Sequence, residues 1–336
     1  MIRILILGDG RLGHVHLSDG IAAAVQRRRP VTISRIDVSR GRWPGPVAAL
    51  MTRSNLSSDR LLTTIYGLDP EDLPDVDLII SAGAETLAAN ICIARRLRAQ
   101  NIFYGSLRQY RPSDFSLVLT SYRRAVRAAN MVQTLKPSAF DPDDLPALQR
   151  GSVPQQLGLV IGGPTRGVVY RDAEWGQLAA LLQRSHEDNG IRWVVSNSRR
   201  TPPEATARFQ ALAEPADGPV SALIDVDDTD APGLPDLFAQ VGGIVCTADS
   251  SSMISEAVWA RRPLVTVAPE AFRLSLNEKA YRDWMIQNGW YAAHRLARLT
   301  PTVLVDALLA LQPLKDNPLD ALAELLEKHL QLPVVA

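Results

Sequence analysis

A chain of 336 residues exceeds the comfortable size of one hydrophobic core, so its length predicts roughly two domains. Lys plus Arg and Asp plus Glu both number 36, and this zero net charge argues against nucleic-acid binding. The two cysteines, Cys92 and Cys246, lie inside apolar runs without C-x-x-C spacing, which excludes a disulfide framework and a cysteine-based zinc site. No apolar stretch reaches about 18 residues, so we expect a cytoplasmic protein without a transmembrane segment. Peripheral membrane contact stays open.

Short apolar runs bounded by Gly, Asp or Ser alternate with longer amphipathic segments, which is typical of βα units around parallel sheets. In the first half, strands are predicted at 3–7, 32–38, 78–81, 102–104 and 117–119, and helices at 17–28 and 86–100. In the second half, strands are predicted at 157–161, 193–196, 244–247 and 264–267, and helices at 175–185, 206–214 and 251–260, before a helical tail at 302–332.

The second half repeats the pattern of the first after a Pro- and Asp-rich stretch at 136–146, whose composition is that of a linker. We therefore predict an α/β protein of two tandem Rossmann-like domains, 1–150 and 151–305, followed by C-terminal helices at 306–336. The sequence leaves open whether these helices pack back on the first domain. Ligands of such sheets bind beyond the carboxyl ends of the strands, so the residues directly after each strand are the candidates for function.

The first of these loops, Gly8-Asp9-Gly10-Arg11-Leu12-Gly13, matches G-x-G-x-x-G between a strand and a helix. This pattern is typical of dinucleotide binding, with Asp37 as the acidic partner, but glycines are equally needed where a strand turns tightly into a helix. No Tyr-x-x-x-Lys pair occurs, which argues against a short-chain dehydrogenase or epimerase that uses NAD. His14 is a candidate general base, or else a hydrogen-bonded residue at the helix start; Asp9 is the weaker catalytic candidate.

Three loops of the second half carry residue types that suit a bound anion. Paired glycines let a backbone approach a ligand, hydroxyls and guanidinium groups bind phosphate, and a helix N-terminus attracts negative charge. A glutamate one turn into that helix can reach a ribose diol. The alternative interpretation is ordinary helix capping with solvated arginines. The candidate binding residues are Gly162, Gly163, Thr165, Arg166, Ser196, Ser198, Arg199, Asp249, Ser250, Ser251, Ser252 and Glu256.

Together these motifs resemble the plant mitochondrial-fission ELM family and its bacterial relatives, which were once labelled nucleoside-diphosphate-sugar epimerases. The resemblance runs over 4–269, and its most specific part is Thr247-Ala248-Asp249-Ser250-x-Ser252-Met253-x-Ser255-Glu256-Ala257. The same stretch is similar to the nucleotide-sugar signature of glycosyltransferase-B (GT-B) enzymes. A departure is Gly83-Ala84-Glu85-Thr86, where relatives have Gly-Arg-Arg-Thr. This departure puts an anion contact of the first domain in doubt.

The resemblance implies a GT-B architecture with an interdomain cleft, a nucleoside-diphosphate sugar on the second domain, an unknown acceptor facing the first, and no metal or required cofactor. On this hypothesis Arg166, Arg199 and the helix dipole stabilise the leaving diphosphate, Glu256 binds the ribose and His14 deprotonates the acceptor. Two alternatives stay open. One is a non-catalytic adaptor on the same fold, for which Trp284, Trp290 and Tyr291 could supply an exposed patch, although packing in the core is the favoured role for them. The other is an NAD(P)-binding epimerase or oxidoreductase.

Overall fold

The computed structural model describes residues 1–148 and 151–332, and the chain forms two compact units. Unit 1 consists of Met1–Phe140 and Asp316–Ala336, and unit 2 of Asp141–Lys315. The division therefore lies at Phe140, whereas the predicted boundary at residue 150 falls outside the described residues.

Unit 1 is built on a six-stranded parallel sheet in the order β2-β1-β3-β4-β5-β6. The predicted strands of the first half are confirmed, and the short β6 was missed because three residues carry too little periodicity. The strands are β1 (Ile2–Gly8), β2 (Val31–Asp37), β3 (Leu78–Ala82), β4 (Gln100–Tyr104), β5 (Leu117–Thr120) and β6 (Met131–Gln133).

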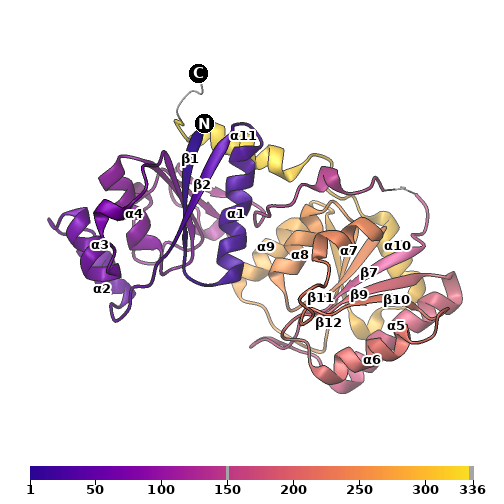
Figure 1. Cartoon of the computed structure of the whole chain (residues 1–336). Helices are drawn as coiled ribbons and strands as arrows, with labels where there is room; N and C mark the ends of the chain where they lie inside the picture. The colour runs from indigo at the N-terminus through magenta and orange to yellow at the C-terminus, as the bar shows by residue number, and fades with distance from the viewer. Residues whose placement is uncertain (149–150, 333–336) are drawn as a thin grey trace. The chain divides into compact units, whose positions relative to one another are not determined.

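Helices cover both faces of this sheet, with α2, α3 and α4 on one face and α1 and α11 on the other (Figure 1). Arg27 at the end of α1 pairs with Asp320 of α11 at 2.9 Å, so the C-terminal helix packs on unit 1. Helix α1 begins five residues earlier than predicted and includes His14 in its first turn. The helices are α1 (Leu12–Gln26), α2 (Gly45–Met51), α3 (Ser58–Tyr66), α4 (Leu87–Leu97) and α11 (Pro318–His329).

Unit 2 repeats the design with a second six-stranded parallel sheet in the order β10-β9-β7-β11-β12-β14, beside a small antiparallel pair, β8 and β13. Strands β10 and β14 lie at the sheet edges and were not predicted. The strands are β7 (Gln156–Val160), β8 (Val168–Val169), β9 (Arg192–Ser196), β10 (Val220–Ile224), β11 (Gly243–Thr247), β12 (Leu264–Ala268), β13 (Ala271–Phe272) and β14 (Tyr291–Arg295).

The helices of unit 2 also divide between the two faces: α5, α6 and α10 cover the face that holds Trp175, Trp193 and Phe209, and α7, α8 and α9 cover the other (Figure 1). The predicted helical tail is interrupted after α10 by a segment that contains Pro313, and Asn317 caps α11. The helices are α5 (Asp172–Asn189), α6 (Pro203–Ala213), α7 (Leu234–Gln240), α8 (Ser251–Trp259), α9 (Leu276–Gln287) and α10 (Pro301–Ala310).

Single 3₁₀ turns complete the two units. They lie at Pro70–Asp72, Pro112–Asp114, Arg123–Ala125, Pro142–Asp144 and Leu296–Arg298. Within the ranges that the structure describes, no helix combines the length and the apolar character that crossing a membrane requires.

The strand orders identify one switch point in each sheet, where the chain changes its direction of growth. In unit 1 this point lies between β1 and β3, and in unit 2 between β7 and β11. Ligands of open parallel sheets bind at the carboxyl ends of the strands at such points. The loops after these four strands are therefore the places to look for a site.

Candidate functional site

The residues that follow β7 and β11 contact each other at the unit 2 switch point. The Gly162 amide donates a 2.7 Å hydrogen bond to Thr247 Oγ1, and the Gly163 amide donates a 2.9 Å hydrogen bond to Asp249 Oδ2. The Asp249 side chain is 0% exposed, and its Oδ1 has no hydrogen-bond partner among the described residues. Asp249 therefore joins two loops from within and does not present its carboxylate at the surface.

Gly162 and Gly163 leave no free space beside their backbone. A Cβ at Gly162 would clash with the Asp249 carboxylate, and one at Gly163 would clash with the carbonyl of Arg200. The chain's own atoms fill the space where a side chain would stand at these two positions, and ligand binding by these glycines stays a prediction. Both glycines are required by the packing of one loop against another.

Arg200 and Thr201 bring the loop after β9 onto the same glycines. An Arg200 guanidinium nitrogen lies 3.1 Å from Asp249 Oδ2, and Thr201 Oγ1 donates a 2.6 Å hydrogen bond to the Gly162 carbonyl. The three loops that the sequence singled out in the second half therefore meet. Arg200 was not among the predicted site residues. Arg199, which was, is exposed, and its side chain has no partner in the described part of the chain.

Helix α8 begins beside this junction. Ser250 caps it by accepting a 3.4 Å hydrogen bond from the Met253 amide, so the capping interpretation holds for Ser250. Ser251 and exposed Ser252 form the first turn, where amides lack intrahelical acceptors and the helix dipole is positive. Glu256 is partly exposed one turn further on. The helix start thus combines serine hydroxyls with a favourable field for an anion.

Some of the other predicted residues of unit 2 are buried or hydrogen-bonded within the chain, and others are exposed to solvent. Ser196 is buried at the end of β9, and Ser198 Oγ lies 3.2 Å from Thr201 Oγ1. Partly exposed Thr165 closes a turn through its amide, which donates a 2.9 Å hydrogen bond to the Val168 carbonyl. Arg166 is exposed, and no other described residue pairs with its side chain. Arg166 and Arg199 are therefore the two predicted cations that a ligand can reach.

Two buried residues that the sequence analysis missed hold the segment before Asp249. Arg282 donates a 2.7 Å hydrogen bond to the Ala248 carbonyl, and the Ala248 amide donates a 2.9 Å hydrogen bond to the Tyr170 hydroxyl. Burial raises the pKa of Tyr170, so its hydroxyl stays protonated and donates to the Val267 carbonyl. These residues lie 34 and 78 positions from Ala248, and no local pattern signals them.

Asp9 and His14 form a hydrogen-bonded pair at the unit 1 switch point. His14 Nδ1 lies 2.8 Å from Asp9 Oδ2, and the two side chains are 30% and 1% exposed. The pair packs against Gly83, whose φ is +92° and where a Cβ would clash with both side chains. Asp9 therefore orients the imidazole, and His14 is the member of the pair that an external hydroxyl can reach.

Glu85, the residue that replaces an expected arginine, is paired with Arg40 from the loop after β2. Their closest nitrogen and oxygen atoms lie 2.5 Å apart, and the Arg40 guanidinium holds the pKa of Glu85 below its ordinary value of 4.5. The Tyr66 hydroxyl donates a 2.8 Å hydrogen bond to the Glu85 carbonyl. A cation is thus present near this edge of the sheet, but it already binds a carboxylate.

The glycines of the G-x-G-x-x-G pattern serve different needs. A Cβ at Gly8 would clash with the Asp37 carboxylate, and Gly10 has a φ of +75°. A Cβ at Gly13 would meet nothing within 4 Å. In the dinucleotide fingerprint the third glycine permits close packing of helix and strand, and Gly13 has no such role. The pattern therefore lends the NAD(P) alternative no further support.

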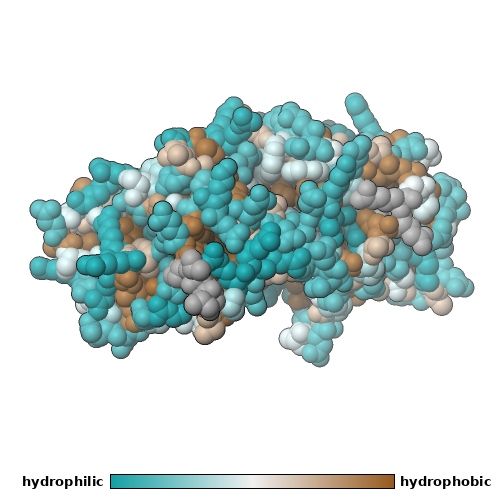
Figure 2. Space-filling model, turned by 90° about the horizontal axis from the view of Figure 1, so that it is seen from above, coloured by the Kyte–Doolittle hydropathy of each residue, from teal (hydrophilic) through white to brown (hydrophobic). Residues whose placement is uncertain are grey.

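Trp284, Trp290 and Tyr291 do not form an exposed patch. Tyr291 is 1% exposed, and the partly exposed rings of Trp284 and Trp290 pack edge to face with 5.0 Å between centroids. Exposed leucines such as Leu50 and Leu276 belong to different elements. On the face drawn in Figure 2, hydrophilic side chains cover most of the surface and hydrophobic ones show between them.

Few of the described side chains are suited to metal binding or to thiol chemistry. Among residues 1–148 and 151–332, no three His, Cys, Asp or Glu side chains group closely enough to hold a metal ion. Cys92 and Cys246 are both buried, as predicted, and burial raises the pKa of the Cys92 thiol to about 12. A protonated thiol is a poor nucleophile, so neither cysteine adds chemistry to the two switch points.

Comparison with known proteins adds a family and a fold. The family model described as "Mitochondrial fission ELM1" matches residues 12–322. Among curated proteins, no sequence matches this chain. MurG from Acinetobacter baumannii has a similar structure, with a TM-score of 0.53 and 15% identity, over 98% of this chain and 100% of that one. UDP-GlcNAc 2-epimerase from Methanocaldococcus jannaschii has a TM-score of 0.56 and 12% identity, over 98% and 99%.

A third similar structure is the S. aureus MnaA–UDP co-structure, with a TM-score of 0.53 and 11% identity, over 96% of this chain and 94% of that one. Identities this low establish the fold alone. They confirm the predicted α/β class with two Rossmann-like domains of the GT-B architecture.

Proposed function

The chain belongs to the mitochondrial fission ELM1 family, and we propose that its unit 2 binds a nucleoside-diphosphate sugar at the β7–β11 switch point. The observation that carries the proposal is the meeting of three loops there, since Gly163, Arg200 and Asp249 are joined by hydrogen bonds beside the first turn of α8. The proposal is also supported by the similar structures of MnaA with UDP and of a UDP-GlcNAc 2-epimerase.

In this proposal the diphosphate lies at the first turn of α8, where unsatisfied amides and the helix dipole favour negative charge. Arg199 and Arg166 pair with its oxygens, because both are exposed and their side chains have no partner among the described residues. Glu256 accepts hydrogen bonds from the ribose diol. Asp249 acts as a positioning residue, since its buried carboxylate holds Gly163 and Arg200 in place.

A thermal-shift screen of the full chain with UDP, GDP, CMP, NAD and NADP tests this binding. A nucleoside diphosphate at about 100 times its dissociation constant stabilises the folded protein by about 2.7 kcal/mol, which raises the melting temperature measurably. Arg199→Ala should abolish the shift. Arg184→Ala is the matched control, because Arg184 is also an exposed arginine and lies within α5. If no nucleotide at millimolar concentration stabilises the protein, the non-catalytic adaptor replaces this proposal.

We further propose that the protein is a metal-independent glycosyltransferase in which His14 deprotonates an acceptor hydroxyl. Support comes from the Asp9–His14 pair, in which a buried carboxylate orients a partly exposed imidazole. The sugar donor whose nucleotide stabilises the protein serves as substrate, and release of its nucleoside diphosphate is followed. His14→Gln and Asp9→Asn should slow release about 100-fold while leaving the nucleotide's thermal shift unchanged. Equal release by wild type and both variants would remove His14 from the mechanism.

A further inference from the structure

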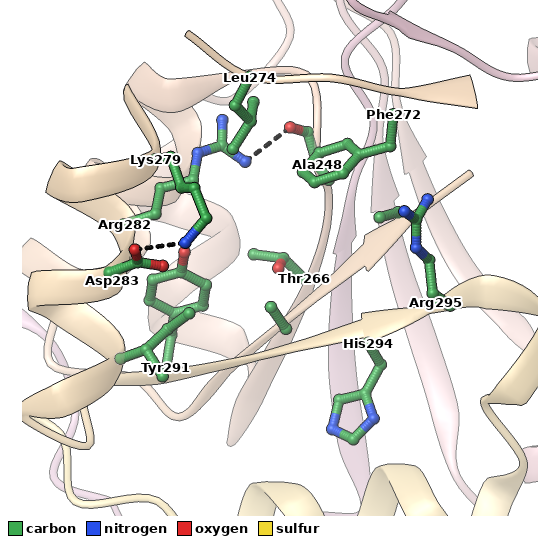
Figure 3. A pocket seen from close by; sticks show the side chains of 13 residues that line it. Ala248, Thr266, Phe272, Leu274, Lys279, Arg282, Asp283, Tyr291, His294 and Arg295 are labelled. Atoms are coloured by element: carbon green, nitrogen blue, oxygen red, sulfur yellow. Dashed lines mark hydrogen bonds and ion pairs between the residues drawn. The ribbon is translucent and has the colours of Figure 1, made fainter. Parts of the chain in front are cut away.

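A pocket of about 360 Å³ lies in unit 2 between α9 and the edge of the sheet formed by β12 and β14 (Figure 3). This volume is within the range of small-molecule sites. Thr266 and Ala268 of β12 and Ala293 of β14 line its floor, and Phe272, Leu274 and Ile286 supply larger apolar side chains. None of the predicted nucleotide-binding residues lines it. The pocket is therefore a separate place to consider for a ligand.

Tyr291 presents a hydroxyl without a partner in this pocket. The residue is 1% exposed, and its hydroxyl makes no hydrogen bond to any other described residue. Figure 3 shows the ring directed toward the α9 side of the pocket. Burial raises the pKa of Tyr291, so the hydroxyl is a donor at neutral pH. A ligand atom that accepts a hydrogen bond could therefore pair with this hydroxyl inside the pocket.

The charges around the pocket leave one cation uncompensated. Lys279 pairs with Asp283 at 2.6 Å, and Arg282 pairs with Glu278 at 2.8 Å. Arg295 lies over the Phe272 ring, 5.3 Å from its centroid. Its guanidinium donates to the carbonyls of Pro269 and Glu270, but it pairs with no carboxylate in the described part of the chain. A planar guanidinium suits a carboxylate, which it can bind through two parallel hydrogen bonds.

The two polar groups lie at opposite ends of one strand face. Tyr291, Ala293 and Arg295 alternate along β14, so all three side chains point to the same side of the sheet. Four residue steps along the strand place Tyr291 and Arg295 about 13 Å apart along the backbone. The small side chain of Ala293 between them leaves the pocket floor open, whereas the His294 side chain points away from the pocket (Figure 3). The shape thus favours an elongated ligand.

We propose that this pocket binds a small, elongated organic carboxylate whose carboxylate pairs with Arg295 and whose opposite end carries a hydrogen-bond acceptor for Tyr291. Its apolar body packs on Phe272, Leu274 and Ile286. This inference does not depend on nucleotide binding, because none of these residues belongs to the α8 site.

The test uses the full chain without nucleotide and para-hydroxyphenylpropionate as the probe, with binding followed by ligand-observed NMR and titration calorimetry. A dissociation constant of about 1 mM or below is expected for so small a ligand. The neutral amide, para-hydroxyphenylpropanamide, should bind at least about tenfold more weakly because it lacks the charge for Arg295. No saturable binding of the carboxylate probe would overturn the proposal.

Substitutions of pocket residues test whether para-hydroxyphenylpropionate binds in this pocket. Tyr291→Phe should weaken para-hydroxyphenylpropionate about tenfold and leave phenylpropionate, which lacks the hydroxyl, unchanged. Because this substitution removes an unpartnered hydroxyl, the melting temperature should not fall.

Arg295→Gln should weaken the binding of both carboxylates, whereas Arg298→Gln, at an exposed arginine outside the pocket, should weaken neither. Ala293→Leu, on the exposed edge strand, should fill the floor and abolish binding. Wild-type affinity in Ala293→Leu would place the probe elsewhere and overturn the proposal.

Discussion

Each switch point contains a buried aspartate that packs against a glycine. In unit 1 the aspartate follows the first strand of the pair and the glycine the second, and in unit 2 this order is reversed. In unit 1 the buried aspartate, Asp9, follows β1 and packs against Gly83 after β3. In unit 2 the glycines follow β7, and the buried aspartate, Asp249, follows β11. In both units a glycine makes room for a carboxylate at the junction of two neighbouring strands. The repeated fold therefore places an aspartate at the same kind of junction twice.

The difference lies in what each aspartate holds. Asp9 holds an imidazole, a side chain that can accept and donate a proton, and this ring is 30% exposed. Asp249 holds the Gly163 amide and the Arg200 guanidinium, which act here only as hydrogen-bond donors. The unit 1 junction is thus suited to proton transfer, and the unit 2 junction to rigid positioning of loops.

The largest effect is expected from removal of the unit 2 aspartate. Asp249→Ala leaves the buried Gly163 amide without its acceptor, and we expect a loss of about 3 kcal/mol in the free energy of unfolding. Asp9→Ala should cost only about 1 kcal/mol, because His14 is partly exposed and can turn to water.

Chemical denaturation measures both variants. Tryptophan fluorescence reports mainly on unit 2, which contains Trp175, Trp193, Trp259, Trp284 and Trp290, whereas unit 1 contains Trp43. Circular dichroism follows both units. Equal losses in the two variants would contradict the idea that only Asp249 is a structural support.

A smaller effect is expected at the glycine beside the catalytic candidate. Gly83→Ala combines a strained φ of +92° with a clash against His14 and Asp9, and should cost about 2 kcal/mol. Gly10→Ala is the matched control, because its φ of +75° is strained but a Cβ there meets nothing within 4 Å, so about 1 kcal/mol is expected. Hydrogen exchange of α1 and β3 measures both. A Gly83 variant no worse than the Gly10 variant would mean that the pair tolerates displacement.

The smallest effect concerns the Arg40–Glu85 pair near the unit 1 junction. Arg40 lowers the pKa of Glu85 in the folded state, so the pair stabilises the protein above the unfolded value near 4.5, and this contribution is lost as the pH falls through the folded value. Glu85 is 38% exposed, so the contribution is about 0.5 kcal/mol or less. Glu85→Gln should be slightly less stable than wild type at pH 7, and this difference should shrink as the pH falls below 4.5. A constant difference across this range would show that the ionised pair does not contribute.

Most of the fold was predictable because buried parallel strands are continuous apolar runs, as in 3–7 and 244–247, whose signal is local. The elements that were missed carry weak local signals: β6 has three residues, and the edge strand β14 mixes Ala with His and Arg. The break between α10 and α11 was missed although Pro313 stood in the predicted helix. The candidate loops were predictable from their position after strands, but the contacts within them were not.

By itself, the amino-acid sequence determined the α/β class, the duplication of the βα pattern and the loops that reach the carboxyl ends of the strands. These follow from periodicity and from local turn chemistry. Only the tertiary structure decided that Asp9 orients His14, that Arg200 and not Arg199 pairs with Asp249, and that Tyr291 lies unpartnered in a pocket. Hydrogen bonds and burial depend on which distant residues the fold brings within about 3 Å, and no spacing along the chain encodes that.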